Sequence, residues 1–129
     1  MKRILLAFVV LLGFQTYAFS QALPSGSLWR NQRGSTLEVF FADPSGSFQG
    51  TFINQAAGFQ CRGTPYPATG TAQNAAAVFA VTFVQCTSHT TWYGTVIGNT
   101  MRTNWVLVYI PPSGPPQTVR GSDVFTRVR

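Results

Sequence analysis

The sequence predicts an all-β protein, and more specifically an eight-stranded antiparallel up-and-down β-barrel. No helix-period pattern of apolar residues occurs after the N-terminal segment of the 129-residue chain. Eight short segments instead alternate between apolar and polar residues, and tight turn signals separate most of them. Short consecutive strands joined by tight turns favour an up-and-down barrel, in which closure also removes exposed sheet edges.

The first 22 residues form a predicted secretory signal peptide. Lys2 and Arg3 provide a short basic start, residues 4–14 are an apolar run, and small residues follow up to Ala22. The apolar run is too short to span a bilayer comfortably. We therefore expect residues 23–129 to form one small barrel domain that is secreted or periplasmic and is not attached to a membrane.

The first four predicted strands cover residues 28–31, 36–42, 48–53 and 66–73. Successive residues of a strand face opposite sides of the sheet. The faces expected to point into the barrel carry Trp29 and Asn31, then Ser35, Leu37, Val39 and Phe41, then Phe48, Gly50, Phe52 and Asn54. Turn signals occur at residues 33–34 and 43–46, and a longer connection, residues 54–65, precedes the fourth strand.

The last four predicted strands cover residues 76–84, 90–97, 102–110 and 121–128. Turn signals at residues 73–74 and 98–99 separate them, and a proline-rich connection, residues 111–116, precedes the last strand. Their inward faces carry Phe79, Val81 and Phe83, then Ser88, Thr90, Trp92 and Gly94, then Thr103, Trp105 and Leu107, then Gly121, Asp123 and Phe125.

The predicted interior is typical of a ligand cavity rather than of a plain core. The hairpin around residues 98–99 places two indoles beside small hydroxyls on one face, whereas a plain core prefers aliphatic residues. Polar residues also lie near one end of the inward faces, namely Asn31, Ser35, Asn54, Thr90 and Asp123. We expect a small ligand that is partly flat and partly polar. A half-buried hairpin with two structural tryptophans is the alternative interpretation.

The two cysteines, Cys61 and Cys86, are expected to form one disulfide, because the protein is predicted to be exported. The chain has one histidine, His89, predicted to lie at the surface, and no second cysteine pair, which argues against a metal site. The formal charge of +6 becomes +4 without Lys2 and Arg3. The remaining arginines are scattered, which argues against a nucleic-acid partner.

An enzyme is not expected, because the inward faces offer no pair of carboxylates and no nucleophile beside a histidine. Ser88 and His89 are neighbours on one strand and so face opposite ways. A lipocalin-like carrier of apolar ligands would have the same architecture. Such a carrier would not need several polar residues converging on one end of the barrel.

The chain resembles the family of avidins and streptavidin. The matching stretches follow one another along nearly the whole predicted mature chain and are W-R-N-Q-R-G-S-T at 29–36, G-T-F-I-N at 50–54, S-H-T-T-W at 88–92, T-N-W-V-L at 103–107 and G-S-D-V-F-T at 121–126. Each stretch alone is a weak signal, and together they are specific. The resemblance implies a secreted protein, not an enzyme, that holds biotin non-covalently as a ligand and needs no cofactor.

The resemblance also implies roles for single residues. Asn31 and Ser35 correspond to donors to the ureido oxygen of biotin. Asp123 and Asn54 correspond to acceptors from the two ureido N–H groups.

The remaining implied roles concern the sulfur, the tail and the walls of the site. Thr90 corresponds to a residue that faces the thioether sulfur, and Ser88 to one that meets the valerate carboxylate at the mouth. Trp92, Trp105 and Phe83 correspond to the walls around the rings and the chain.

Three departures from the family pattern stand out. Phe52 replaces a tyrosine that donates to the ureido oxygen, and Phe83 replaces a third wall tryptophan. The loop at residues 111–119 lacks the tryptophan that tetrameric members lend to a neighbouring subunit. With Cys61 and Cys86 in the loops after the third and fifth strands, this resembles the dimeric, disulfide-bearing branch, so a homodimer is expected, with a higher homo-oligomer or a different small ligand as alternatives.

Overall fold

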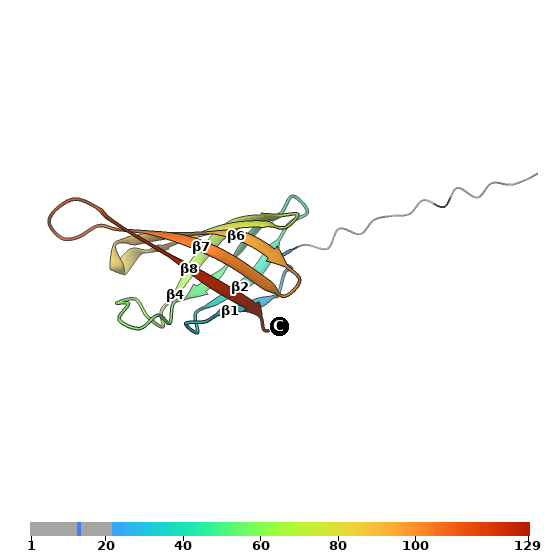
Figure 1. The fold of residues 1–129 in the computed structure, drawn as a ribbon, viewed down its shortest axis with the longest axis horizontal. Helices are drawn as coiled ribbons and strands as arrows, with labels where there is room; N and C mark the ends of the chain where they lie inside the picture. Colours follow the sequence, from blue (N-terminus) through green and yellow to red (C-terminus); the bar gives the residue numbers. More distant parts are fainter. Residues whose placement is uncertain (1–12, 14–21) are drawn as a thin grey trace, which may run out of the picture.

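Eight strands form a closed antiparallel barrel, so the predicted fold class is confirmed (Figure 1). The computed structural model describes Gly13 and residues 22–129, and the predicted signal peptide lies outside the described residues except at Gly13 and Ala22. Each strand pairs with its neighbours along the chain, and β1 also pairs with β8. The strands are β1 (Leu28–Asn31), β2 (Thr36–Ala42), β3 (Ser47–Ile53), β4 (Pro65–Gln73), β5 (Ala76–Phe83), β6 (Ser88–Ile97), β7 (Thr100–Tyr109) and β8 (Gln117–Arg127).

The observed strand ends differ from the predicted ones mainly around β6 to β8. β8 begins at Gln117, four residues earlier than predicted, because residues 117–120 continue the ladder with β7 although their side chains are polar or exposed. β5 ends at Phe83, and residues Val84–Cys86 form a short 3-10 helix, η1. This helix ends at Thr87, whose φ of 46° is in the left-handed region.

A β-bulge in β2 overturns one predicted side-chain direction. The pairing of β2 with β3 shifts register between Val39 and Phe41. Phe41 was expected to point into the barrel, but it is 58% exposed, because the extra residue at the bulge reverses the alternation. A Cβ on Gly50, opposite the bulge, would overlap the backbone oxygen of Glu38, so the close approach of these strands requires glycine here.

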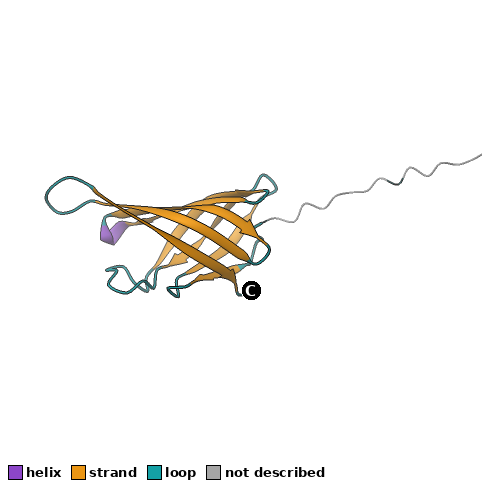
Figure 2. Ribbon diagram, viewed as in Figure 1, coloured by secondary structure: helices purple, strands orange, loops and turns teal. Residues whose placement is uncertain are grey.

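All the longer connections lie at one end of the barrel. The up-and-down order brings the β1–β2, β3–β4, β5–β6 and β7–β8 connections to the same end, and the tight turns lie mainly at the other (Figure 1). The β3–β4 loop, η1 and the projecting β7–β8 loop are seen together in Figure 2. At this end the barrel interior can be reached from solvent, and the long connections can fold over the opening.

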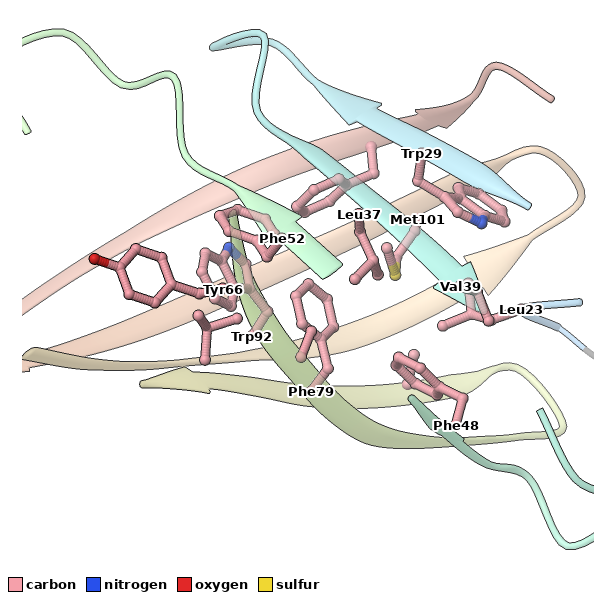
Figure 3. Packing of buried hydrophobic residues seen from close by; sticks show 14 of the residues in the cluster. Leu23, Trp29, Leu37, Val39, Phe48, Phe52, Tyr66, Phe79, Trp92 and Met101 are labelled. Atoms are coloured by element: carbon pink, nitrogen blue, oxygen red, sulfur yellow. The ribbon is translucent and has the colours of Figure 1, made fainter. Parts of the chain in front are cut away.

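An aromatic core fills the barrel towards the end with the tight turns (Figure 3). The Trp29 indole is fully buried and donates from Nε1 to Ser27 Oγ at 3.0 Å. Phe79 stacks on Trp92 with ring centroids 4.9 Å apart and planes at 9°. Fully buried aromatics of this kind contribute about 1.5–3 kcal/mol each through burial alone. The stacked Trp92 ring lies at the boundary between this core and the cavity at the other end of the barrel.

The predicted disulfide is present and ties the β3–β4 loop to η1. Cys61 and Cys86 are bonded, with their Cα atoms 6.0 Å apart, and both side chains are buried. The Tyr66 hydroxyl donates to Gln85 Oε1 and lies 3.2 Å from Cys61 Sγ. The bond closes a loop with a sequence separation of 25 residues and fixes the β3–β4 loop to the connection between β5 and β6.

Reducing the disulfide is expected to destabilise the fold. In the chain-entropy model, a loop of this size corresponds to about 3 kcal/mol of unfolding free energy. Denaturant unfolding of the oxidised protein and of a Cys61→Ser, Cys86→Ser double variant measures the difference. Equal midpoints and slopes for the two proteins would contradict the expectation.

Candidate ligand-binding site

A cavity of 270 Å³ lies inside the barrel at the end with the long connections. It is lined by Asn31, Arg33, Ser35, Phe52, Asn54, Ala56, Ala57, Gly58, Phe59, Thr90, Trp92, Trp105, Leu107 and Asp123. Of the residues predicted to bind ligand, all but Phe83 and Ser88 line this cavity. One end of the cavity is polar and its walls are aromatic, as a small-molecule site requires.

The strand register explains how β6, β7 and β8 bring the wall together. Trp92 pairs with Trp105, and Trp105 pairs with Gly121, so the two indoles lie side by side on one row of inward residues. A Cβ on Gly121 would overlap Cζ2 of Trp105, so only glycine lets the Trp105 ring lie over β8. The next row towards the closed end contains Thr103 and Asp123, which places the carboxylate below the indoles.

The hydrogen bonds of Asn31 and Ser35 fix which of their atoms remain for a ligand. Asn31 Oδ1 accepts from the backbone N–H of Arg33 and of Ser35, both at 3.0 Å. The amide NH₂ of Asn31 therefore remains as a donor. Ser35 Oγ accepts from the backbone N–H of Gln55 at 2.8 Å, so its O–H is free to donate. Both buried residues thus present donors at the polar end of the cavity.

Asn54 begins the β3–β4 loop and has one acceptor site already in use. Its Oδ1 accepts from the backbone N–H of Ala56 at 2.8 Å. This local bond is an Asx-type turn, which directs the chain over the cavity. A carbonyl oxygen has two lone pairs, so Asn54 Oδ1 can still accept one hydrogen bond from a ligand.

The Asp123 carboxylate is buried and accepts hydrogen bonds from three side chains. Oδ1 accepts from Gln32 Nε2 at 2.8 Å and from Arg33 Nε at 3.1 Å, and Oδ2 accepts from Trp92 Nε1 at 2.9 Å. Only 3% of the Asp123 side chain is exposed, whereas Arg33 is 44% exposed. A carboxylate has about four acceptor positions, so one position on Oδ2 remains for a ligand N–H.

Two hydroxyls on β6 are buried without a hydrogen-bond partner. They are Thr90 Oγ1 and Ser88 Oγ, whose residues are 3% and 1% exposed. An unsatisfied buried hydroxyl costs about 1–3 kcal/mol. Thr90 lines the cavity, and Ser88 lies two residues further towards the open end, in an adjoining hollow. Such groups in a folded protein are typical of a site that a ligand completes.

The aromatic residues divide into walls and support. Phe52 lines the cavity, is fully buried and lies 4.6 Å from Trp92 between ring centroids. Phe83 does not line the cavity, and it supports Phe52 at 6.2 Å and Phe59 at 5.0 Å, both edge-on. Phe83 therefore acts on the cavity through these two rings.

Five lining residues were not predicted from the sequence, namely Arg33, Ala56, Ala57, Gly58 and Phe59, and two of these have large side chains. Arg33 was interpreted as part of a turn and as one of several scattered charges, yet its guanidinium reaches Asp123. Phe59 lies in the Gly- and Ala-rich β3–β4 loop and closes one side of the cavity. A single aromatic residue two positions before Cys61, in a loop anchored by that cysteine, was the signal that could have identified it.

Other kinds of site receive no support within the described part of the chain. No group of three or more His, Cys, Asp or Glu residues that could hold a metal ion occurs among residues 22–129. No described helix is long and apolar enough to cross a membrane. His89 is exposed, as predicted, and its Nδ1 lies 3.1 Å from Thr82 Oγ1.

Comparison with known proteins places these features in a family. The avidin family model matches residues 20–128. Afifavidin from Afifella pfennigii is 37% identical over 110 residues, covering 79% of this chain and 68% of afifavidin. The bradavidin2–biotin complex has a TM-score of 0.78 and 48% identity, covering 83% of this chain and 100% of that one. The rhizavidin–biotin complex has a TM-score of 0.71 and 36% identity, covering 79% of this chain and 98% of that one. The chain belongs to the avidin family.

Proposed function

We propose that this protein binds biotin non-covalently inside the barrel. The observation that carries the proposal is the arrangement of donors and acceptors at the polar end of the cavity. Asn31 and Ser35 present donors there, and Asp123 keeps one acceptor position free. A cyclic urea has one oxygen that accepts and two N–H groups that donate, so it complements this arrangement.

The remaining lining fits the rest of the biotin molecule. The indoles of Trp92 and Trp105 offer flat apolar walls for the fused rings. Thr90 Oγ1, without a partner in the free protein, can donate to the thioether sulfur. Biotin complexes of two similar proteins, bradavidin2 and rhizavidin, support the choice of ligand. As a member of the avidin family, the protein is a binding protein and not an enzyme.

Because Phe52 has no hydroxyl, the proposed ureido site has two side-chain donors, Asn31 and Ser35. A phenyl ring occupies the cavity wall here but offers no O–H group. The ureido oxygen therefore has Asn31 and Ser35 as its donors, with their geometry already fixed by backbone N–H groups. Such preorganisation lowers the entropy cost of binding.

We also propose that the protein is exported. Residues 1–22 have the pattern of a signal peptide, and the Cys61–Cys86 bond is of the kind that persists in oxidising compartments. The mass of the protein recovered outside the cytoplasm tests this. A mass that corresponds to the uncleaved chain would contradict it.

Biotin binding through Asp123 is expected to be visible in tryptophan fluorescence, because two of the three tryptophans line the cavity. Asp123→Asn keeps the shape but removes the charge and one acceptor, so we expect biotin to bind about 10- to 100-fold more weakly. Glu38→Gln, on the outer face of β2, is the control and should bind as the unmodified protein does. An unchanged dissociation constant in Asp123→Asn would show that the ligand does not use this carboxylate.

Thr90→Val should change stability and binding in opposite directions. It removes an unsatisfied buried hydroxyl, so the free protein should gain about 1 kcal/mol of unfolding free energy, while biotin should bind several-fold more weakly. Thr103→Val is the matched control, because Thr103 Oγ1 donates to the Asp123 backbone oxygen at 2.9 Å and its loss should destabilise the protein. Thermal unfolding and biotin titration of both variants measure this, and a destabilised Thr90→Val would contradict it.

We propose that two copies associate through the outer face of β5 to β8. One row across these strands contains Val78, Tyr93, Asn104 and Ser122, with Val78 40% and Tyr93 44% exposed. This row carries no charge, as the centre of an interface requires, and the two flanking rows carry Arg102 and Arg120. A closed twofold dimer is the commonest assembly among soluble homo-oligomers.

Light scattering is expected to give twice the monomer mass at micromolar concentration. Tyr93→Arg should shift the mass to that of a monomer, because it introduces a charge into the buried face. Gln49→Arg places the same charge on the outer face of β3 and should leave the dimer intact. A monomer mass for the unmodified protein would overturn the proposal.

A further inference from the structure

Arg33 and Asp123 place a pair of opposite charges in the lining of the cavity. Arg33 Nε lies 3.1 Å from Asp123 Oδ1. In the part of the chain that the structure describes, these two are the only charged residues that line this cavity. The other carboxylates lie elsewhere, Asp43 in the turn between β2 and β3 and Glu38 on the outer face, 3.7 Å from Arg129. The charges at the polar end of the cavity therefore balance.

The backbone of the turn between β1 and β2 holds Arg33 in this position. The Arg33 N–H donates to Asn31 Oδ1 at 3.0 Å, and the Gly34 N–H donates to the Asn31 backbone oxygen at 3.0 Å. The preceding side chain is also fixed, because Gln32 donates to Asp123 and its Oε1 accepts from the β8 backbone at 2.9 Å. Arg33 is therefore part of the site, although 44% of its side chain is exposed.

Arg33 and the proposed ligand meet opposite oxygens of the Asp123 carboxylate. Oδ1 accepts from Gln32 and Arg33, whereas the acceptor position that remains for a ligand is on Oδ2, beside the bond from Trp92. The ligand therefore does not have to displace the guanidinium. With ordinary bond lengths, the guanidinium lies roughly 5–7 Å from a group bound at Oδ2, a range at which one unit charge still acts strongly on another.

The balance of charge matters because a carboxylate between indoles is by itself a good site for a cation. Asp123 without Arg33 would attract a positively charged ring, and the faces of Trp92 and Trp105 would add a cation–π attraction. With Arg33 in place, a cation at Oδ2 meets a like charge nearby. A neutral urea N–H donates to the same oxygen without that repulsion, so Arg33 acts against the wrong class of ligand.

We propose that Arg33 is a specificity-determining residue, which restricts the site to uncharged rings such as cyclic ureas and excludes rings that carry a positive charge. This inference rests on the proposed function. Asn31 and Ser35 present donors to a ureido oxygen and so select separately against an N–H group at that position. Their contribution is common to all variants of Arg33, so the part due to Arg33 can be measured by itself.

The test compares biotin with 2-iminobiotin, in which a C=NH group replaces the ureido C=O and which is a guanidinium cation at neutral pH. Calorimetric titration gives the ratio of the dissociation constant of 2-iminobiotin to that of biotin. Arg33→Gln keeps an N–H donor for Asp123 but removes the charge. We expect the ratio to fall about tenfold in this variant, because solvent screens part of the field of a half-exposed charge. Arg33→Lys keeps the charge and should keep the ratio of the unmodified protein within about threefold.

Arg62→Gln is the matched control for the loss of one positive charge. Arg62 is exposed, donates to Gln55 Oε1 at 3.4 Å and does not line the cavity, so this variant should leave both constants unchanged. The proposal is wrong if the ratio in Arg33→Gln equals that of the unmodified protein, or if it falls equally in Arg33→Lys.

A second neutral variant, Arg33→Met, separates selectivity from a structural role. Loss of biotin binding in both Arg33→Gln and Arg33→Met would show that Arg33 maintains the shape of the site, and this would also overturn the proposal. Retained biotin binding with a lowered ratio in Arg33→Met would support it. If the unmodified protein binds neither compound, the proposed function itself is wrong, so the two failures are distinguishable.

Discussion

The buried carboxylate of Asp123 is the group on which the rest of this structure depends. It accepts hydrogen bonds from Gln32 and Arg33, in the turn after β1, and from Trp92 on β6. These bonds join β8 to the first and the sixth strands beside the place where β1 and β8 close the barrel. An ionised carboxylate in apolar surroundings is costly without such partners. Closure of the fold and the polar end of the cavity therefore depend on the same bonds.

The cavity combines groups that are satisfied in the free protein with groups that are not. Asn31 and Ser35 have their acceptor atoms engaged by backbone N–H groups, which fixes the direction of their donors without any ligand. Thr90 and Ser88 have no partner, so the free protein bears the cost of their burial. The site therefore shows a trade-off between stability and binding, because it keeps polar groups that do not stabilise the fold.

Period-two alternation predicted much of the candidate site. The placement of Trp92, Trp105 and Asp123 follows from it, because β6, β7 and β8 pair without a register shift. Phe41 was wrongly predicted, since a bulge depends on the approach of the partner strand and leaves no mark in the alternation of β2 itself. Alternation gave no indication of Phe59, because its loop has no periodicity and its path is set by the disulfide and by local turns. Only its place two residues before Cys61 pointed to it.

The regular pairing of β6 to β8 also determines how a protein of this kind can change. Because side chains alternate, inserting one residue within β6 would turn Trp92 outward and bring its neighbours into the barrel. A strand can therefore gain or lose residues only in pairs if its inward side chains are to stay inward. Each such pair moves the site along the barrel axis by the same distance. The loops at the open end carry no such restriction. Variation in what the barrel holds is thus confined to substitutions on existing rows and to the length of the connections, such as residues 54–64 and 110–116, that surround the opening.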